Sequence, residues 1–186
     1  MVAKASILRA AATVYNRTGA DASVEEILQE AGISRATFYR HFRSKEALQE
    51  ALLAFASQTL LDAVENAAAE TESPAERIDA GVRAFLSFHG EQPGVYRVLL
   101  ASALAPGSEL HEIQARARDR FASLLESEVE RAGLASVDPL VLHALVAAME
   151  GTSVGLLLHR PDVDPDVLER ARAALVHIVS ATLGVE

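Results

Sequence analysis

The sequence contains no cysteine and no tryptophan, and only 5% of its residues are aromatic. The absence of cysteine excludes disulfide scaffolds, thiolate zinc sites and cysteine nucleophiles. No run of about 18 residues is free of charge, so we expect no transmembrane helix. Residues 1–9 also lack the pattern of a signal peptide. We therefore expect a cytoplasmic protein without a membrane partner.

Half of the 186 residues are apolar, and alanine and leucine dominate, which favours helix over sheet. Apolar residues recur with a period of 3.6 throughout and with a period of 2 almost nowhere. Counting these segments between their proline, glycine and capping residues predicts nine helices and no convincing strand. The predicted fold is all-α. The length accommodates one large domain, or a small domain joined to a larger one.

Charge is distributed unevenly along the chain. The net charge is −9, yet residues 1–50 carry seven Lys and Arg against six Asp and Glu, a balance of +1. The remainder carries ten against twenty, a balance of −10. Because an acidic surface repels nucleic acid, any such contact is expected in the N-terminal third.

The segment from Ala31 to Lys45 is the most informative stretch. Before it, Ser23 and Glu26 have the spacing of a capping box that opens a helix. Gly32 is suited to end that helix, and Ser34 to cap a second, short one. Two short helices joined by a tight turn with glycine form a helix-turn-helix motif, whose second helix can enter a DNA major groove.

Helical geometry separates the residues of this second helix into two faces. Phe38 and Phe42 are four residues apart and should dock inward onto Leu8, Val24 and Ile27. Arg35 and Ala36 lie at the tip, Tyr39 on the flank. Arginine and threonine can contact base edges or phosphate, whereas tyrosine, histidine and lysine suit phosphate oxygens. The predicted DNA-binding residues are Ser23, Ser34, Arg35, Ala36, Thr37, Tyr39, Arg40, His41 and Lys45.

Residues 23–27, 31–34, 37–42 and 44–48 together resemble the signature of the TetR family of transcriptional repressors. The resemblance covers about the first fifty residues and is specific there, and Ala36 stands where many members have glycine. Beyond it, the chain is similar to the family only in the number and spacing of helices and in length. The resemblance implies an N-terminal three-helix DNA-binding head, residues 1–47, and a C-terminal helical ligand-binding and dimerisation body, residues 48–186.

The same resemblance implies how the protein works. A homodimer binds a palindromic double-stranded DNA operator with two heads, and a small-molecule effector of unknown identity binds in the body and releases the DNA. An alternative is a helical interaction or ligand-binding protein of the same fold that does not bind DNA. Loss of positive charge on the short helix would favour that alternative, and here the charge is present.

The last two predicted helices, about Asp138–His159 and Asp166–Thr182, are apolar over more than one face. This excess indicates burial against a partner. The resemblance supplies a second copy of the chain, joined in a four-helix bundle. Gly151 and Gly155 are four residues apart, which would allow another helix to approach closely.

Polar and aromatic residues within the apolar helices are candidates for the effector pocket, because ligand sites combine apolar walls with a few polar groups. Each is equally compatible with ordinary core or interface. Arg97 with Tyr96 would suit an anion, and Glu150 a cation. The candidates are Phe85, Phe88, His89, Tyr96, Arg97, Phe121, Leu125, His143, Met149, Glu150 and Ser153.

The sequence offers little for catalysis. Residues 151–155 match the GxSxG pattern of serine hydrolases, but a nucleophile elbow needs a preceding strand and these residues are predicted to be helical. None of the six histidines follows a glutamate at the spacing of a di-iron site. We therefore expect no enzyme, no metal site and no cofactor.

Overall fold

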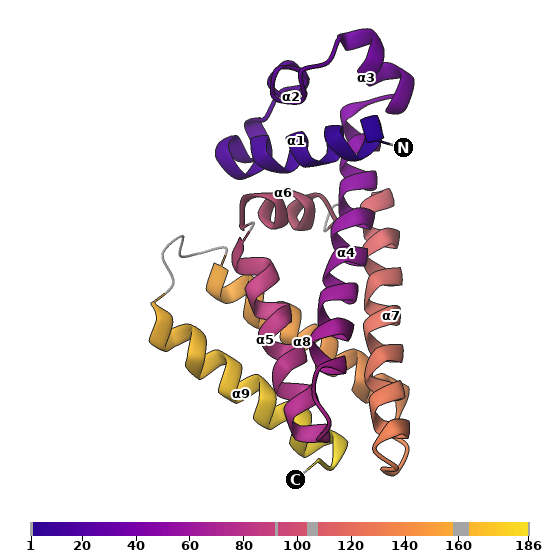
Figure 1. Ribbon diagram of the computed structural model, residues 1–186, viewed down its shortest axis with the longest axis vertical. Helices are drawn as coiled ribbons and strands as arrows, with labels where there is room; N and C mark the ends of the chain where they lie inside the picture. The colour runs from indigo at the N-terminus through magenta and orange to yellow at the C-terminus, as the bar shows by residue number, and fades with distance from the viewer. Residues whose placement is uncertain (1, 92, 104–107, 158–163, 186) are drawn as a thin grey trace. The chain divides into compact units, whose positions relative to one another are not determined.

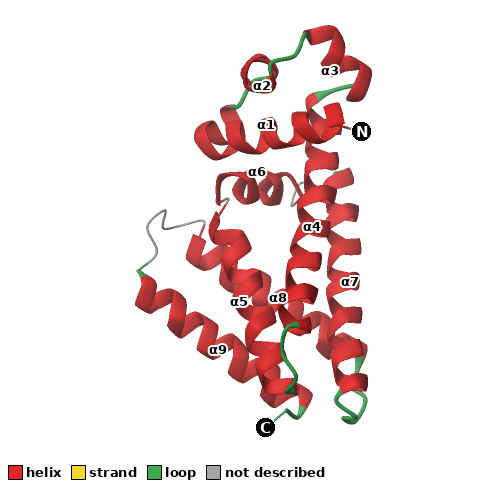
Figure 2. Ribbon diagram, in the orientation of Figure 1, coloured by secondary structure: helices red, strands yellow, loops and turns green. Residues whose placement is uncertain are grey.

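The protein was analysed as a computed structural model, which describes residues 2–91, 93–103, 108–157 and 164–185. Within these ranges the chain forms nine α-helices and no strand (Figures 1 and 2), as predicted. The helices are α1 Val2–Thr18, α2 Val24–Ala31, α3 Arg35–His41, α4 Lys45–Ala69, α5 Pro74–Glu91, α6 Pro93–Ala103, α7 Glu109–Arg131, α8 Pro139–Leu157 and α9 Pro165–Leu183. A single 3-10 turn, Gly19–Asp21, follows α1.

The helix ends follow the capping chemistry of the sequence. Ser73 Oγ accepts the Glu76 N–H at 3.2 Å, just ahead of Pro74 at the start of α5. Asp164 accepts the Asp166 N–H at 3.0 Å, and Pro165 opens α9. The last two helices were predicted at Asp138–His159 and Asp166–Thr182. Leu158 and His159 of the first range lie outside the described residues.

The chain divides into two compact units. The first comprises Met1–Ser57 and Gln92–Gln114, and the second comprises Gln58–Glu91 and Ala115–Glu186. The first unit includes α6 because this helix packs on α1. The two units therefore interleave along the chain. The assignment of DNA binding to residues 1–47 and of ligand binding and dimerisation to residues 48–186 stays a prediction.

The core of the first unit joins α1, α2, α3, the start of α4 and α6. It contains Ile7, Val14, Tyr15, Ile27, Phe38, Leu48 and Leu99, each at most 2% exposed. The contact between α1 and α6 is close, because Gly94 has no side chain: a Cβ there would lie 2.6 Å from the Asn16 Cα. Asn16 Oδ1 accepts the Val95 N–H at 3.1 Å. Its side chain thus satisfies one of the free N–H groups at the start of α6.

The core of the second unit joins α4, α5, α7, α8 and α9. It is built from leucine, valine, isoleucine and phenylalanine, with Leu142, Leu175 and Val179 each 2% exposed. The window Pro139–Leu156 of α8 is long and apolar enough to cross a membrane by length and composition, and 28% of it is buried. Core helices of soluble proteins pass the same test, so this property alone does not indicate a membrane protein.

Candidate nucleic-acid interface and body pocket

The turn between α2 and α3 is set by two caps and one glycine. Ser23 Oγ accepts the Glu26 N–H at 3.2 Å, and the Glu26 carboxylate accepts the Ser23 N–H at 2.8 Å, which completes the predicted capping box. The Ser23 N–H, and the Ser23 hydroxyl at 2.9 Å, donate to the Glu26 carboxylate and lower its pKa. Gly32 has φ +63°, a left-handed conformation that favours glycine. Ser34 then caps α3 by accepting the Thr37 N–H at 3.2 Å.

The two aromatic residues of the inward face hold α3 against the rest of the unit. Phe38 is fully buried and Phe42 is 3% exposed, and their ring centroids are 5.8 Å apart. Leu8 and Ile27 belong to the same buried cluster, and Val24 packs against it. The predicted inward docking of Phe38 and Phe42 is therefore confirmed. Because Phe38 and Phe42 are buried in the core, the opposite face of α3 points away from the core.

The outward face presents the polar side chains that were predicted to meet DNA. Arg35, Ala36, Arg40 and His41 are exposed, and Tyr39 is 48% exposed, with its ring edge-on to Phe38 at 5.3 Å between centroids. Thr37 is half-buried, and its hydroxyl shares a 3.0 Å hydrogen bond with Ser34 Oγ. Within the described part of the chain, Arg40 has no acidic partner. Its charge is available to a ligand.

One acidic residue does reach this face, which the sequence pattern alone did not indicate. Glu25 lies in the first turn of α2, and its carboxylate pairs with the guanidinium of Arg35 at the first position of α3. The pair spans the turn of the motif, and both side chains are well exposed. Binding of DNA by Arg35 therefore requires exchange of a carboxylate for a phosphate or a base.

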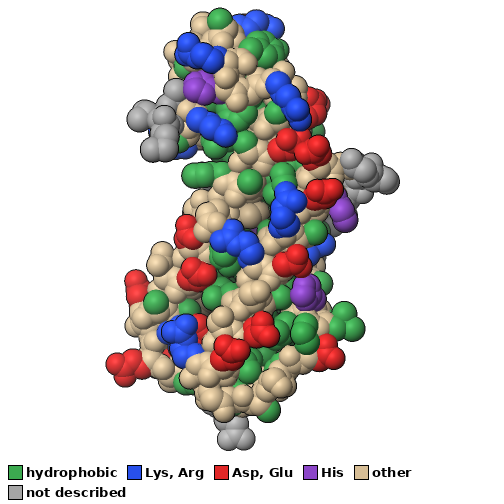
Figure 3. All heavy atoms as spheres, turned by 90° about the vertical axis from the view of Figure 1, so that its right-hand side faces the viewer, with side chains coloured by type: hydrophobic (Ala, Val, Ile, Leu, Met, Phe, Trp, Pro, Cys, Tyr) green, Lys and Arg blue, Asp and Glu red, His purple; other side chains and the backbone are tan. Residues whose placement is uncertain are grey.

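Lys45 and Ser23 flank the outward face. Lys45 is the first residue of α4; its ammonium lies 3.4 Å from the Ala20 carbonyl oxygen and 5.9 Å from the centroid of the Tyr15 ring. Ala20 is three residues before Ser23, so the ammonium lies close to the chain leading into α2. Burial raises the pKa of Tyr15 to about 12, so its ring stays neutral beneath this cation. Figure 3 shows blue Lys and Arg side chains on the surface of the head, and others farther along the molecule.

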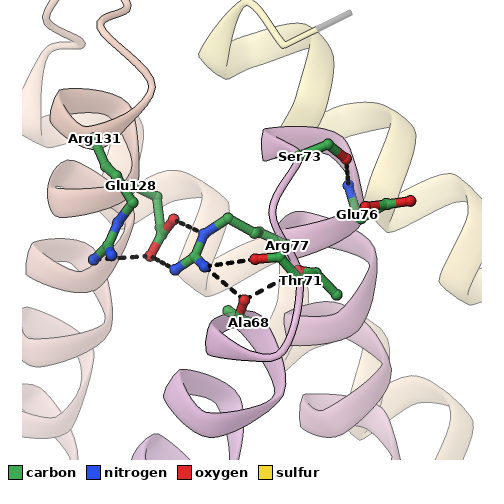
Figure 4. A network of polar contacts seen from close by, with 7 residues as sticks. All are labelled: Ala68, Thr71, Ser73, Glu76, Arg77, Glu128 and Arg131. Atoms are coloured by element: carbon green, nitrogen blue, oxygen red, sulfur yellow. Dashed lines mark hydrogen bonds and ion pairs between the residues drawn. The ribbon is translucent and has the colours of Figure 1, made fainter.

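The second unit contains an apolar pocket. It is lined by α4, α5, α7, α8 and α9, and its cavity volume is about 60 Å³. One end is formed by Arg77 of α5 and Glu128 of α7, which make an ion pair (Figure 4). The other lining residues are Val64, Ala68, Ile78, Gly81, Val82, Phe85, Phe121, Leu124, Leu125, Val146, Met149 and Val179.

Four of the predicted ligand-binding residues line this pocket, namely Phe85, Phe121, Leu125 and Met149. Their role in binding stays a prediction. Phe88 packs against the surrounding core without lining the pocket. Tyr96 and Arg97 belong to α6, in the other compact unit. The residues that the sequence missed include Gly81, Arg77 and Glu128, which are brought there only by the packing of α5 against α7.

The remaining polar candidates do not line the pocket either. His143 is exposed and bonds the Pro139 carbonyl oxygen at 2.8 Å and the Asp119 carboxylate at 3.0 Å, and these two contacts raise its pKa. Glu150 accepts a hydrogen bond from Arg118 Nε at 2.6 Å. These two side chains are therefore engaged in surface or rim contacts.

His89 and Ser153 are buried one helical turn beyond lining residues, since they follow Phe85 and Met149 by four positions. His89 Nδ1 lies 2.8 Å from the Phe85 carbonyl oxygen, and burial lowers the pKa of His89 to about 4. Ser153 is fully buried, and among the described residues its hydroxyl has no hydrogen-bond partner. It lies within α8, so residues 151–155 are helical and form no nucleophile elbow.

Two family models match the chain. Residues 7–52 match the model described as bacterial regulatory proteins, tetR family, and residues 73–181 match that of the tetracyclin repressor-like C-terminal domain. The first match spans the helix-turn-helix and its supporting helices. The second spans most of the helical body, including all of the pocket-lining residues except Val64 and Ala68.

Individual proteins are also similar to this chain. The nucleoid occlusion factor SlmA of Marinomonas sp. (strain MWYL1) is 29% identical over 133 residues, which are 70% of this chain and 68% of that protein. SlmA of Aliivibrio fischeri (strain MJ11) is 28% identical over 144 residues, 74% of each. A putative TetR-family transcriptional regulator from Rhodococcus sp. has the same fold, with a TM-score of 0.79 at 22% identity over 98% of this chain and all of the other.

Proposed function

Because this chain belongs to the TetR family of bacterial regulatory proteins, and is thus a non-enzymatic DNA-binding regulator, we propose that it is a transcriptional repressor released by an effector. It binds a palindromic operator as a homodimer, and a small molecule in the helical body releases it. The observation that carries the DNA-binding part is the outward face of α3, where exposed Arg35, Tyr39, Arg40 and His41 stand opposite a fully buried Phe38.

Each residue of this face has a role that follows from its chemistry. Arg35 and Ala36 at the tip of α3 enter the major groove first, where Arg35 can donate two hydrogen bonds to a guanine edge. Thr37 contacts a base edge or a thymine methyl group. Tyr39, Arg40 and His41 contact phosphates. Lys45 holds a neighbouring phosphate through its ammonium, and Ser23 and the start of α2 contribute a hydroxyl and the N–H groups that the capping box does not use.

The homodimer is supported by an uncovered apolar face on the last two helices. On α8, Leu140 is 76% exposed and Val141 is 38% exposed; on α9, Ile178 is 45% exposed. A stripe of small exposed residues continues along α8 at Ala144, Ala147, Ala148, Gly151 and Gly155. Small residues allow a second helix to approach closely, so a second copy of α8 and α9 would complete a four-helix bundle.

The dimer can be tested in solution. Ile178→Glu places a charge on the proposed interface, and the expected result is dissociation to a monomer in sedimentation experiments with intact helicity by circular dichroism. Ser127→Glu adds the same charge to an exposed position of α7 and is expected to leave the dimer intact. A wild-type protein that sediments as a monomer would contradict the proposal, and an aggregate that requires detergent would point to a membrane.

The DNA-binding function is tested by selecting the sequences that the protein binds from a random DNA pool. A two-fold dimer should select two inverted half-sites separated by about one helical turn, roughly 34 Å. Arg40→Ala should lose binding to the selected sequence, whereas Arg83→Ala removes an exposed arginine from α5 and should retain it. Failure to select any sequence would favour the alternative, a protein of this fold that does not bind DNA.

A second candidate comes from the relatives named nucleoid occlusion factors, because their similarity extends beyond the head to 133 or 144 residues. In this case the chain would bind DNA in nucleoid occlusion without effector release. Operator binding that no pocket ligand weakens would favour this second candidate.

A further inference from the structure

The lining of the body pocket is apolar except at one end. Of its 14 lining residues only Arg77 and Glu128 carry charge. The other side chains are aliphatic or aromatic, and Gly81 contributes none. Burial of an unpaired charge against such walls is strongly unfavourable, and a polar group without a hydrogen-bond partner is also costly there.

The two charged residues satisfy each other. Arg77 donates from Nε and Nη2 to the two carboxylate oxygens of Glu128, at 2.7 and 2.9 Å. Its Nη1 donates to the carbonyl oxygens of Ala68 and Thr71, at 2.7 and 3.1 Å. An anionic ligand would have to displace Glu128 from Arg77, and a cationic ligand would have to displace Arg77 from Glu128. In either case one largely buried charge loses its two-pronged partner, and a displaced Glu128 would keep at most the longer contact with Arg131, which is 3.6 Å here.

From this lining we infer that the pocket binds an uncharged, apolar molecule no larger than about one aromatic ring or a short alkyl chain. The cavity volume of about 60 Å³ is below the roughly 150 Å³ of an apolar cavity that admits benzene, so a single ring is the upper limit and enters only when lining side chains move aside. Met149 supplies the remaining room, because its unbranched side chain adapts to irregular neighbours. Only the role of this molecule as the effector depends on the proposed function.

Gly81 helps to create the space. It lies within α5, and a Cβ added there would meet Val64 Cγ1 at 3.4 Å, an ordinary contact. Alanine therefore fits without moving the backbone, but its methyl group occupies part of the cavity. Gly90, on the same helix, is exposed and has no atom within 4 Å of an added Cβ. Gly81→Ala and Gly90→Ala thus both replace a glycine of α5 by alanine, and only the first fills the pocket.

Binding can be observed at the pocket itself. The chain has two methionines, Met1 and Met149, so methyl-¹³C-methionine labelling reports the pocket by a single internal NMR signal. The probes are toluene, benzoate and benzylammonium at pH 7, which share one ring and differ in charge. Toluene is expected to shift the Met149 signal, and the two ions are expected to bind at least about tenfold more weakly. Equal shifts by all three probes, or no shift by toluene, would overturn the inference.

The two glycine variants locate the site. Gly81→Ala should weaken toluene binding by about tenfold or more, and Gly90→Ala should leave it unchanged. Thermal unfolding checks that both variants are folded, because both should melt at or above the wild-type temperature. A Gly81→Ala variant that is folded and binds toluene like the wild type would overturn the inference.

The effector role is measured separately, as the change in affinity for the selected operator when toluene is added. A toluene-bound protein that keeps its operator affinity would refute effector release and would leave the ligand class established. Operator release by benzoate or benzylammonium with an accompanying Met149 shift, and no effect of toluene, would support effector release and overturn the ligand class.

Discussion

Arg77 and Glu128, 51 positions apart in the sequence, form a two-pronged ion pair across α5 and α7, with N–O distances of 2.7 and 2.9 Å. Their side chains are only 11% and 16% exposed. Arg77 also binds two carbonyl oxygens at the end of α4. The pair thus connects three helices of the second unit and lowers the pKa of the Glu128 carboxyl.

Removal of one partner of this pair is expected to be costly. Arg77→Met leaves the largely buried Glu128 carboxylate with only Arg131, whose Nη2 lies 3.6 Å from a carboxylate oxygen. The free energy of unfolding should therefore fall by about 3 kcal/mol in urea titrations at pH 7. The double variant Arg77→Met, Glu128→Leu removes both charges and should recover most of that loss. A double variant that is as unstable as Arg77→Met alone would show that the ion pair is not the cause.

Glu25 competes with DNA for Arg35. Glu25→Gln should therefore tighten operator binding by up to about fivefold, the range expected for loss of one exposed ion pair. The matched control is Glu30→Gln on the same helix, which removes the same charge from a pair with Arg17. Fluorescence anisotropy with the selected operator measures both. If Glu25→Gln weakens binding, Glu25 instead orients Arg35 for DNA.

Gly94 allows α6 to contact α1 at backbone distance. An added Cβ would lie 2.6 Å from the Asn16 Cα and 2.7 Å from the Tyr15 carbonyl oxygen. Because these are backbone atoms, Gly94→Ala should destabilise the first unit by about 1–3 kcal/mol. Thermal unfolding measures the loss, and Gly90→Ala, which meets nothing within 4 Å, serves as the control. Equal melting temperatures for the two variants would contradict the close contact.

Stability should depend on pH through His89. Burial lowers its pKa from the usual 6.5 to about 4, so between these values the unfolded state binds a proton that the folded state does not. The folded state therefore loses up to about 3 kcal/mol as the pH falls from 6.5 to 4. The loss should be absent from His89→Gln in urea titrations across this range. If the free energy of unfolding depended on pH in the same way in the wild type and in His89→Gln, a buried neutral histidine would be refuted.

Local sequence chemistry predicted most of the fold and the head. Ser23 and Ser34 cap helices, and Gly32 ends one, through contacts with residues only a few positions away. These caps and the turn can therefore be recognised without knowing the rest of the structure. The spacing of Phe38 and Phe42 likewise determines which face of α3 points outward. Nine helices followed from the same periodicity.

Contacts between distant segments could not be predicted. The pairing of Glu25 with Arg35, and that of Arg77 with Glu128, depends on how helices pack. The same holds for the contact between Gly94 and Asn16, which places α6 with the N-terminal helices. The predicted pocket residues are mostly polar or aromatic, whereas the lining is mostly aliphatic and therefore indistinguishable from core in sequence.

The salt dependence of operator affinity tests the central claim most directly. A dimer that neutralises about six to ten phosphates should show a slope of log K against log salt concentration steeper than about −5. Arg40→Ala should reduce the slope by about 2, one phosphate for each head, and Arg83→Ala should not change it. A slope near zero for the wild type would contradict DNA binding through the outward face of α3.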